Sequence, residues 1–183
     1  MSEKNTLVRS LHDIGLAAWF GGSLMGAVGL NGAAAQASDP VERLQLSSAG
    51  WARWVPLNAA AIAAHMVGGL GLIAANRGRV ATQPGARSNT LAKAALTTVA
   101  VGLTAYSGKL GREVDDHSAE GGEGPTEPHD AASPELEAAQ QRLRLIQWTI
   151  PAVTGVLVVL AAQQGEQQRP QSLLRSQMAR LHA

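Results

Sequence analysis

Four long runs of apolar and small residues, free of charged side chains, alternate with charged segments along this chain. The runs comprise Ile14–Ala35, Trp54–Asn76, Ala94–Gly108 and Leu145–Gln164. An α-helix needs about 20 apolar residues to cross about 30 Å of hydrocarbon. Three runs approach or exceed that length, and the third reaches it if Lys93 and Lys109 extend their charged ends toward the lipid head groups. The pattern therefore predicts an all-α fold, a four-helix transmembrane bundle in which residues 1–183 form one domain.

The boundaries of the spans follow from the flanking polar residues. We expect the spans at about residues 11–35, 54–76, 91–110 and 143–164. A soluble bundle of buried Ala-rich helices is the alternative, because Ala and Gly are only weakly apolar on transfer scales. A soluble amphipathic helix would, however, carry charge every turn or two on its wet face, and these runs carry none.

The distribution of charge predicts the topology. With four spans both termini lie on one side, and if that side is the cytoplasm, nine Lys and Arg residues lie inside and six outside. The positive-inside rule then favours N-in, C-in orientation in the cytoplasmic membrane. The aromatic residues expected at the outer interface are Trp51, Trp54, Tyr106 and Trp148.

Small residues recur at steps of three and four along the first two spans, which places them on one helix face. Such faces let membrane helices approach closely. The glycines expected to mediate helix packing are Gly15, Gly22, Gly26, Gly29, Gly68 and Gly71. The same stripe could instead form a homodimer face. Pro56 is expected in the first turn of its helix, where a missing N–H costs nothing.

The segment 111–133 is acidic, rich in Gly and Pro and poor in apolar residues, so it is expected to be a disordered outer loop. His117 and His129 could join its carboxylates in binding a metal, but a solvated linker is the favoured interpretation, because zinc ligands usually have short fixed spacings. Ser133 and Pro134 are typical of a helix start. The tail 170–183 predicts an amphipathic helix against the inner leaflet.

His65 is the one ionisable residue at the centre of a predicted span, and such residues are candidates for function. We single it out as a cofactor-binding candidate. The alternative is a packing histidine bonded to a threonine such as Thr97, Thr98 or Thr104. Haem b held jointly by His12 and His65 is disfavoured, because the sequence positions imply a depth difference of roughly 18 Å. Haem b on His65 alone stays open, and no bound cofactor is the first expectation.

Other classes of chemistry have no sequence signal. The chain has no cysteine, no Lys-containing phosphate-binding glycine motif and no His-Glu-x-x-His zinc motif, so no catalytic or metal-ligating residue is predicted. Dispersed basic residues give no sign of nucleic-acid binding. We expect a non-enzymatic scaffold or accessory subunit, in contact with the lipid bilayer and with a membrane-protein partner or a second copy. The alternative is a haem- or small-ligand-binding redox or transport protein that uses His65.

The stretches LHDIGLAAWFGGSLMGAVGLNGAAA (11–35), SAGWARWVPLNAAAIAAHMVGGLGLIAANRGRV (48–80) and LTAYSGKLG (103–111) resemble a family of uncharacterised actinobacterial four-helix integral membrane proteins. The resemblance implies a membrane location and no assigned activity. His12, Trp19 and the Gly21–Gly22 pair are also similar to the opening of copper-resistance D-type membrane proteins. No copper site is carried over, because the methionines do not form clusters.

Overall fold

The computed structural model describes residues 3–167, which are helical except for the connections between helices. The long helices are α1 (Glu3–Met25), α3 (Pro40–Ala75), α5 (Pro84–Asp116) and α6 (Pro134–Gln167). The short ones are the π-helical turn η1 (Gly26–Leu30), α2 (Asn31–Ala34), α4 (Arg77–Thr82) and the 3-10 turn η2 (Ser118–Glu120). The predicted tail helix at 170–183 lies outside the described residues.

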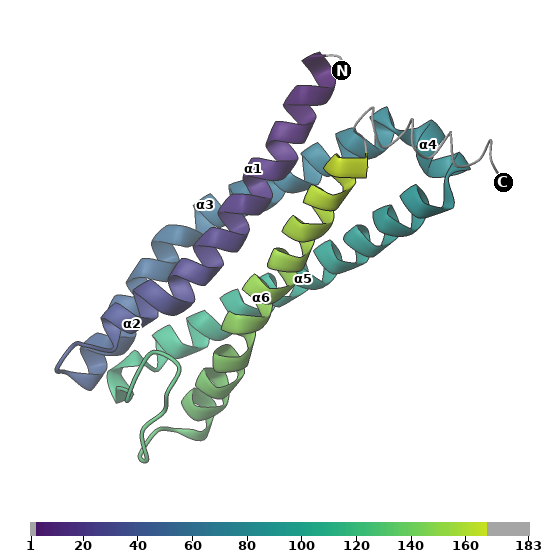
Figure 1. Cartoon of the computed structure of the whole chain (residues 1–183). Coiled ribbons are helices and arrows are strands. Elements are labelled where there is room, and N and C mark those ends of the chain that lie inside the picture. Colours follow the sequence, from purple (N-terminus) through teal and green to yellow (C-terminus); the bar gives the residue numbers. More distant parts are fainter. Residues whose placement is uncertain (1–2, 168–183) are drawn as a thin grey trace.

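The long helices form a ring in which each contacts two others. Helix α1 packs against α3 and α6, and α5 packs against the same two helices. Figure 1 shows the start of α1 and the short α4 at one end of the bundle, which we call the terminal end. The connection from α2 to α3 and the connection from α5 to α6 lie at the opposite end, which we call the loop end.

Three helical segments of the described chain are long and apolar enough to cross a membrane: Thr6–Ala34, Pro40–Ala75 and Pro134–Gln163. Large apolar side chains cover their surfaces, and Ile14, Leu57 and Leu145 are 69%, 62% and 72% exposed. A soluble monomer rarely exposes apolar surface on this scale. The all-helical, membrane-protein character predicted from the sequence therefore stands. Helix α5 does not meet the same criterion, so a fourth span stays a prediction.

Glycines of α1 and α3 bring the two helix backbones into close contact. A side chain on Gly15 would collide with the backbone of Ala61 and His65 in α3, and one on Gly68 would collide with the backbone of Val8 and His12 in α1. No flexible side chain could move aside at either place. This pair of contacts fixes the separation and the register of α1 against α3.

The remaining glycines of the predicted stripe have side chains as neighbours. Gly22 of α1 faces the indole of Trp54, Gly26 at the start of η1 faces the indole of Trp51, and Gly71 of α3 faces Val8. These indoles therefore point toward α1 instead of toward lipid head groups. Gly29 differs from the prediction, because the nearest atoms to an added side chain there belong to Met25 of its own chain segment. It lies inside the π-helical turn η1, which interrupts the 3.6-residue spacing of the stripe.

Helix α3 starts well before the predicted span. Asp39 caps it by accepting a hydrogen bond from the Val41 amide over 2.9 Å, and Pro40 occupies the first turn. Its 36 residues extend about 54 Å, far more than the hydrocarbon thickness. Pro56 consequently lies inside the helix and not in its first turn, which corrects the expectation from the sequence.

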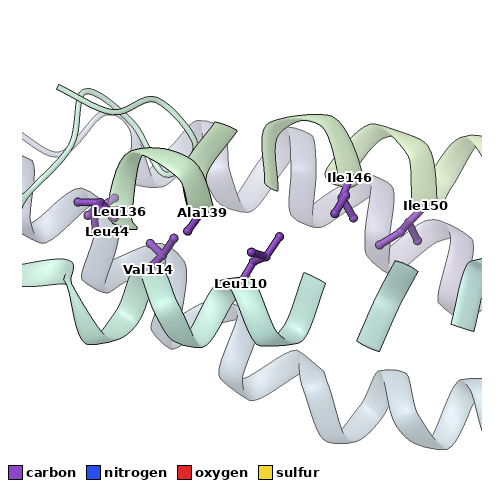
Figure 2. Packing of buried hydrophobic residues seen from close by; sticks show 7 residues of the cluster. All are labelled: Leu44, Leu110, Val114, Leu136, Ala139, Ile146 and Ile150. Atoms are coloured by element: carbon purple, nitrogen blue, oxygen red, sulfur yellow. The ribbon is translucent and has the colours of Figure 1, made fainter. Parts of the chain in front are cut away.

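The principal cluster of buried apolar side chains lies at the loop end (Figure 2). Its members are Leu44, Leu110, Val114, Leu136, Ala139, Ile146 and Ile150, from α3, α5 and α6. Leu44 and Leu136 are fully buried, as in the core of a soluble protein. Leu44, Val114 and Leu136 lie outside the apolar runs, so the helix ends there are held together by ordinary hydrophobic burial, and Ile146 and Ile150 extend the cluster into the fourth run.

The acidic segment 111–133 is folded, unlike the disordered loop expected from its composition. Helix α5 continues through its first part to Asp116, and the 3-10 turn η2 follows at once. Further along, Thr126 is only 5% exposed. The composition of the segment indicates that it cannot form a core of its own. The segment needs no such core, because it packs on the ends of the helices.

Polar contacts hold residues 117–133 against the bundle. The Arg43 guanidinium donates to the carbonyl groups of Gly122 and Glu123 over 3.2 and 3.1 Å. The buried Gln140 amide of α6 donates to the Gly124 carbonyl over 3.0 Å. These bonds satisfy the backbone groups that a loop without secondary structure would otherwise leave unpaired.

The prediction that Ser133 starts a helix is confirmed. The Leu136 amide donates to the Ser133 hydroxyl oxygen over 3.3 Å, and Pro134 is the first residue of α6. Helix α6 then continues without a break into the fourth apolar run. The cap therefore sets where the loop ends and the long helix begins.

We expect Gly68→Ala to destabilise the protein by about 1–3 kcal/mol, because the added carbon meets backbone that can only yield if α1 and α3 separate. Gly102→Ala in α5 is the matched control. A side chain at Gly102 meets nothing within 4 Å, so that substitution should be neutral or stabilise by up to about 1 kcal/mol. Thermal unfolding of the detergent-purified variants measures both. Equal melting temperatures for the two would contradict close α1–α3 contact.

We expect the loop 117–133 to be most protected from amide exchange between about pH 4.5 and 6.5. A hydrogen bond to the Glu113 carbonyl raises the pKa of His117 above its ordinary value of 6.5, so its stabilisation is lost as the pH rises through the raised pKa. The Ser133 amide, 2.7 Å away, lowers the pKa of Glu120 below 4.5, so its stabilisation is lost as the pH falls through the lowered pKa.

Hydrogen exchange followed by mass spectrometry, corrected for intrinsic rates, measures this protection. His117→Gln should abolish the change above pH 6.5 and leave the acidic change in place. Protection that rises steadily from pH 5.5 to pH 8 would contradict the assignment.

Candidate functional site

His12 of α1 and His65 of α3 lie together in the interior of the bundle. Their ring centroids are 4.3 Å apart, with an angle of 41° between the ring planes, and the residues are 5% and 4% exposed. The sequence argument that separated them by roughly 18 Å in depth is therefore wrong. The candidate His65 is where prediction placed it on its helix, but it has a second histidine as a neighbour.

The register of α1 against α3 explains the error. His12 lies against Gly68, while Gly26, which directly follows α1, lies against Trp51. The apolar run that starts at Ile14 thus begins opposite the middle of the apolar run in α3. The midpoint of a run in one helix is not a depth in the bundle when its neighbours are staggered. His65 lies at the level where α1 becomes polar.

Hydrogen bonds fix the orientation of both rings. The Nδ1 atom of His12 is 2.9 Å from an Asp13 carboxylate oxygen, and Nδ1 of His65 is 3.2 Å from the carbonyl oxygen of His12. Carboxylates and carbonyls only accept hydrogen bonds, so each neutral imidazole donates from Nδ1 and keeps its lone pair on Nε2. The Nε2 of His65 lies 3.4 Å from the Thr97 hydroxyl, which can donate to it. The bonded threonine is one of those expected from the sequence.

The two histidines border a cavity of about 320 Å³, which we call the His12–His65 cavity. Its polar lining includes Arg9, His12, Asp13, His65, Asn76, Thr90, Lys93, Thr97 and Thr98. Two cations and one carboxylate give this lining a formal charge of +1 at neutral pH. Side chains of that composition favour a ligand that carries an acidic group.

One wall of the same cavity is apolar and reaches the outer surface of the bundle. Met66 and Leu70 line the cavity, yet they are 46% and 65% exposed. Ile73 continues this wall along α3 and is also exposed. The cavity is therefore not sealed from the apolar surface that faces the surroundings of the helices.

Trp19 packs against His65 but does not itself line the cavity. It is fully buried, and its ring lies edge-on to His65 at a centroid distance of 6.2 Å. Its indole N–H donates to the Thr104 hydroxyl of α5 over 3.2 Å. A large side chain with its one polar atom satisfied gives His65 a stable packing partner.

The histidine geometry bears on the haem hypothesis. Axial imidazoles on opposite faces of a haem are separated by two iron–nitrogen bonds of about 2 Å, which puts their ring centroids roughly 6 Å apart. The observed 4.3 Å is too short for His12 and His65 to enclose a porphyrin. Among the described residues, no three His, Asp or Glu side chains are grouped as a metal site would require.

The two loop histidines of the metal alternative have structural contacts. Nδ1 of His117 bonds to the Glu113 carbonyl, and Nε2 of His129 bonds to the Glu120 carbonyl. The first bond ties the loop to the backbone of α5, and the second joins two parts of the loop itself. The histidines thus help to fold residues 117–133, which the sequence had assigned to a linker.

The sequence missed Lys93, Asp13 and Arg9 as parts of the site, because it gave them the role of charges that flank spans. It also missed a network around Asn31, whose side chain bonds to Ser47, Trp51 and Gln147 over 2.9, 3.0 and 2.8 Å. The only available signal was a polar residue in an apolar run. Three partners on two other helices, α3 and α6, could not be inferred from it.

Comparison with known proteins does not extend these findings, since no family model, curated protein or solved structure matches the chain. The resemblance noted from the sequence accordingly stays a prediction.

Proposed function

We propose that this is a non-enzymatic integral protein of the cytoplasmic membrane that binds an amphipathic ligand with an acidic head group. The observation that carries the proposal is the His12–His65 cavity, in which a cationic polar lining and an exposed apolar wall adjoin. The cavity favours this role over the scaffold or accessory subunit expected from the sequence, because neither of those needs an internal polar site.

The ligand class follows from the two parts of the lining. Lys93 and Arg9 attract a carboxylate or phosphate, and hydroxyl and imidazole groups can complete its hydrogen bonds. An apolar tail fits beside Met66 and Leu70, which continue to the lipid-facing surface of α3. Such a ligand could enter sideways from the bilayer.

The proposal includes four spans with both termini in the cytoplasm. Helix α5 supports the fourth span, because it packs between α3 and α6, two helices that qualify as spans themselves. Of the two lysines that bound its charge-free part, Ala94–Gly108, Lys93 lines the cavity, and Lys109 has a long side chain that can reach the head groups. The Lys and Arg distribution supports the orientation.

Single-cysteine variants test this topology, since the chain has no cysteine of its own. We expect Ser38→Cys and Asp130→Cys to react with a membrane-impermeant maleimide in intact cells. Thr82→Cys should react only after the cells are lysed. If α5 does not span, Asp130→Cys will instead behave like Thr82→Cys while Ser38→Cys does not.

Ligand binding is tested with dansyl-undecanoic acid, a fluorescent carboxylate with an apolar tail. We expect saturable binding to the purified protein and a loss of affinity of about tenfold or more in Lys93→Gln, because a charge-assisted hydrogen bond contributes about 1.5–3 kcal/mol. Lys109→Gln is the matched control, since Lys109 flanks the same apolar run outside the cavity.

No saturable binding, or equal losses in the two lysine variants, would refute the ligand proposal. An absorption spectrum of the same samples tests the alternative that His65 binds haem. A Soret band that disappears in His65→Ala would replace the amphipathic ligand by haem held on His65 alone.

A further inference from the structure

His12 presents an unpaired nitrogen to the His12–His65 cavity. Its Nδ1 bonds to Asp13, whereas its Nε2 makes no hydrogen bond in the described part of the chain. The Nε2 atom keeps some accessible surface, because it is not among the unpaired atoms that are completely buried. Gly69, which also lines the cavity, lies beside this edge of the ring, since a side chain there would meet Cδ2 and Nε2 of His12 at 3.4 and 4.0 Å. A molecule in the cavity can therefore reach Nε2.

The ring of His65 differs in this respect. Its Nδ1 lies 3.2 Å from the His12 carbonyl oxygen, and its Nε2 lies 3.4 Å from the Thr97 hydroxyl. Both ring nitrogens of His65 thus have partners within the protein. Of the two histidines, His12 is the one with a nitrogen left for a ligand.

An acidic head group meets a mismatch at this nitrogen. A neutral imidazole that donates from Nδ1 carries a lone pair on Nε2, and ionised carboxylate and phosphate oxygens only accept hydrogen bonds. Two acceptors that face each other repel. One proton on Nε2 removes the mismatch, because the protonated ring of His12 donates from both nitrogens, to Asp13 and to the ligand.

We propose that the His12–His65 cavity takes up one proton together with its acidic ligand, and that Nε2 of His12 holds this proton. The proposal rests on the amphipathic-ligand function given above and adds the proton as a second ligand of the same site. The proton comes from water and binds to the lone pair of Nε2. No covalent bond of the amphipathic ligand forms or breaks.

The neighbouring groups limit the uptake to one proton and place it on His12. The ring centroids of His12 and His65 are 4.3 Å apart, so two imidazolium cations would repel strongly. The Asp13 carboxylate, 2.9 Å from Nδ1 of His12, stabilises a positive charge on that ring. His65 has an uncharged carbonyl and the Thr97 hydroxyl as its partners. The charge is therefore more stable on His12.

The other charges of the lining explain why the proton accompanies the ligand. Arg9 of α1 and Lys93 of α5 are cations, and Asp13 of α1 is the carboxylate. Among the described residues, α4 and α6 contribute only the uncharged Val80 and Ala161. The two cations oppose a further positive charge in the empty cavity. A bound anion offsets them, so the proton and the ligand each favour the binding of the other.

Calorimetric titration of the purified full chain with dansyl-undecanoic acid measures the uptake. Titrations in Tris and in MOPS differ in heat by the number of protons taken up multiplied by the difference in buffer ionisation enthalpy. They are made at about pH 7.5, one unit above the ordinary pKa of imidazole of about 6.5. We expect about one proton per bound ligand, and an affinity that falls by up to about tenfold from pH 7 to pH 8.

His12→Gln tests the assignment. Its amide can donate to the ligand without a proton from water, so the uptake should disappear and the affinity should lose its dependence on pH. The ionisation of the probe itself contributes to both proteins and cancels in the difference. His117→Gln is the matched control, since His117 bonds to Glu113 outside the cavity and its loss should leave the uptake unchanged.

The outcomes distinguish this inference from the ligand proposal. Saturable binding with equal proton uptake in the wild type and in His12→Gln overturns the inference and leaves the ligand proposal intact. An uptake that persists in His12→Gln and disappears in His65→Gln also overturns it, because the proton then belongs to His65. Absence of saturable binding removes both.

A second measurement serves if His12→Gln does not fold. In the wild-type protein labelled with [15N]histidine, protonated and unprotonated ring nitrogens have well-separated chemical shifts. Saturation with dansyl-undecanoic acid at about pH 7.5 should move one Nε2 resonance from the unprotonated to the protonated range. A saturated protein in which no ring nitrogen makes this change overturns the inference.

Discussion

Backbone contact between α1 and α3 is the constraint on which the rest of the structure depends. Within lipid there is little hydrophobic force between helices, so close packing must supply the attraction, and only glycine permits it at Gly15 and Gly68. Because the contacts are to backbone atoms, they fix the register as well as the distance. That register places the imidazoles of His12 and His65 next to each other at the side of a cavity. The Asp13 carboxylate is hydrogen-bonded to the His12 ring.

The molecule uses different forces at different levels along its length. At the loop end, Leu44, Val114 and Leu136, which lie outside the apolar runs, are buried as in a soluble domain and are held together by hydrophobic burial. Where the apolar runs of neighbouring helices pack against each other, small residues and a few hydrogen-bonded polar groups take the place of such a core. The hydrogen bond from Trp19 to Thr104 is an example. Long helices let one chain combine both kinds of packing.

The sequence predicted an all-α membrane protein, the start of α6 at Pro134 and the contact of His65 with a threonine, since each depends on local pattern or simple chemistry. It did not predict the His12–His65 cavity, because charge-free runs were taken as depth markers and the stagger of α1 is a tertiary property. The folded loop was missed for a related reason. Composition shows that residues 117–133 cannot form a core of their own. It does not show that Arg43 and Gln140 donate hydrogen bonds to the backbone of this segment and hold it on the helix ends.

Trp19 lies between two cavities without lining either of them. It is fully buried, its ring lies against His65 of the His12–His65 cavity, and its indole bonds to Thr104, which helps to line a second cavity of about 370 Å³. The two linings share no residue and differ in charge, since the first has one more cation than carboxylate and the second holds one arginine and one aspartate. A single ligand that passed through both would have to suit two unlike sets of groups. The two cavities are therefore better described as separate spaces than as one continuous path.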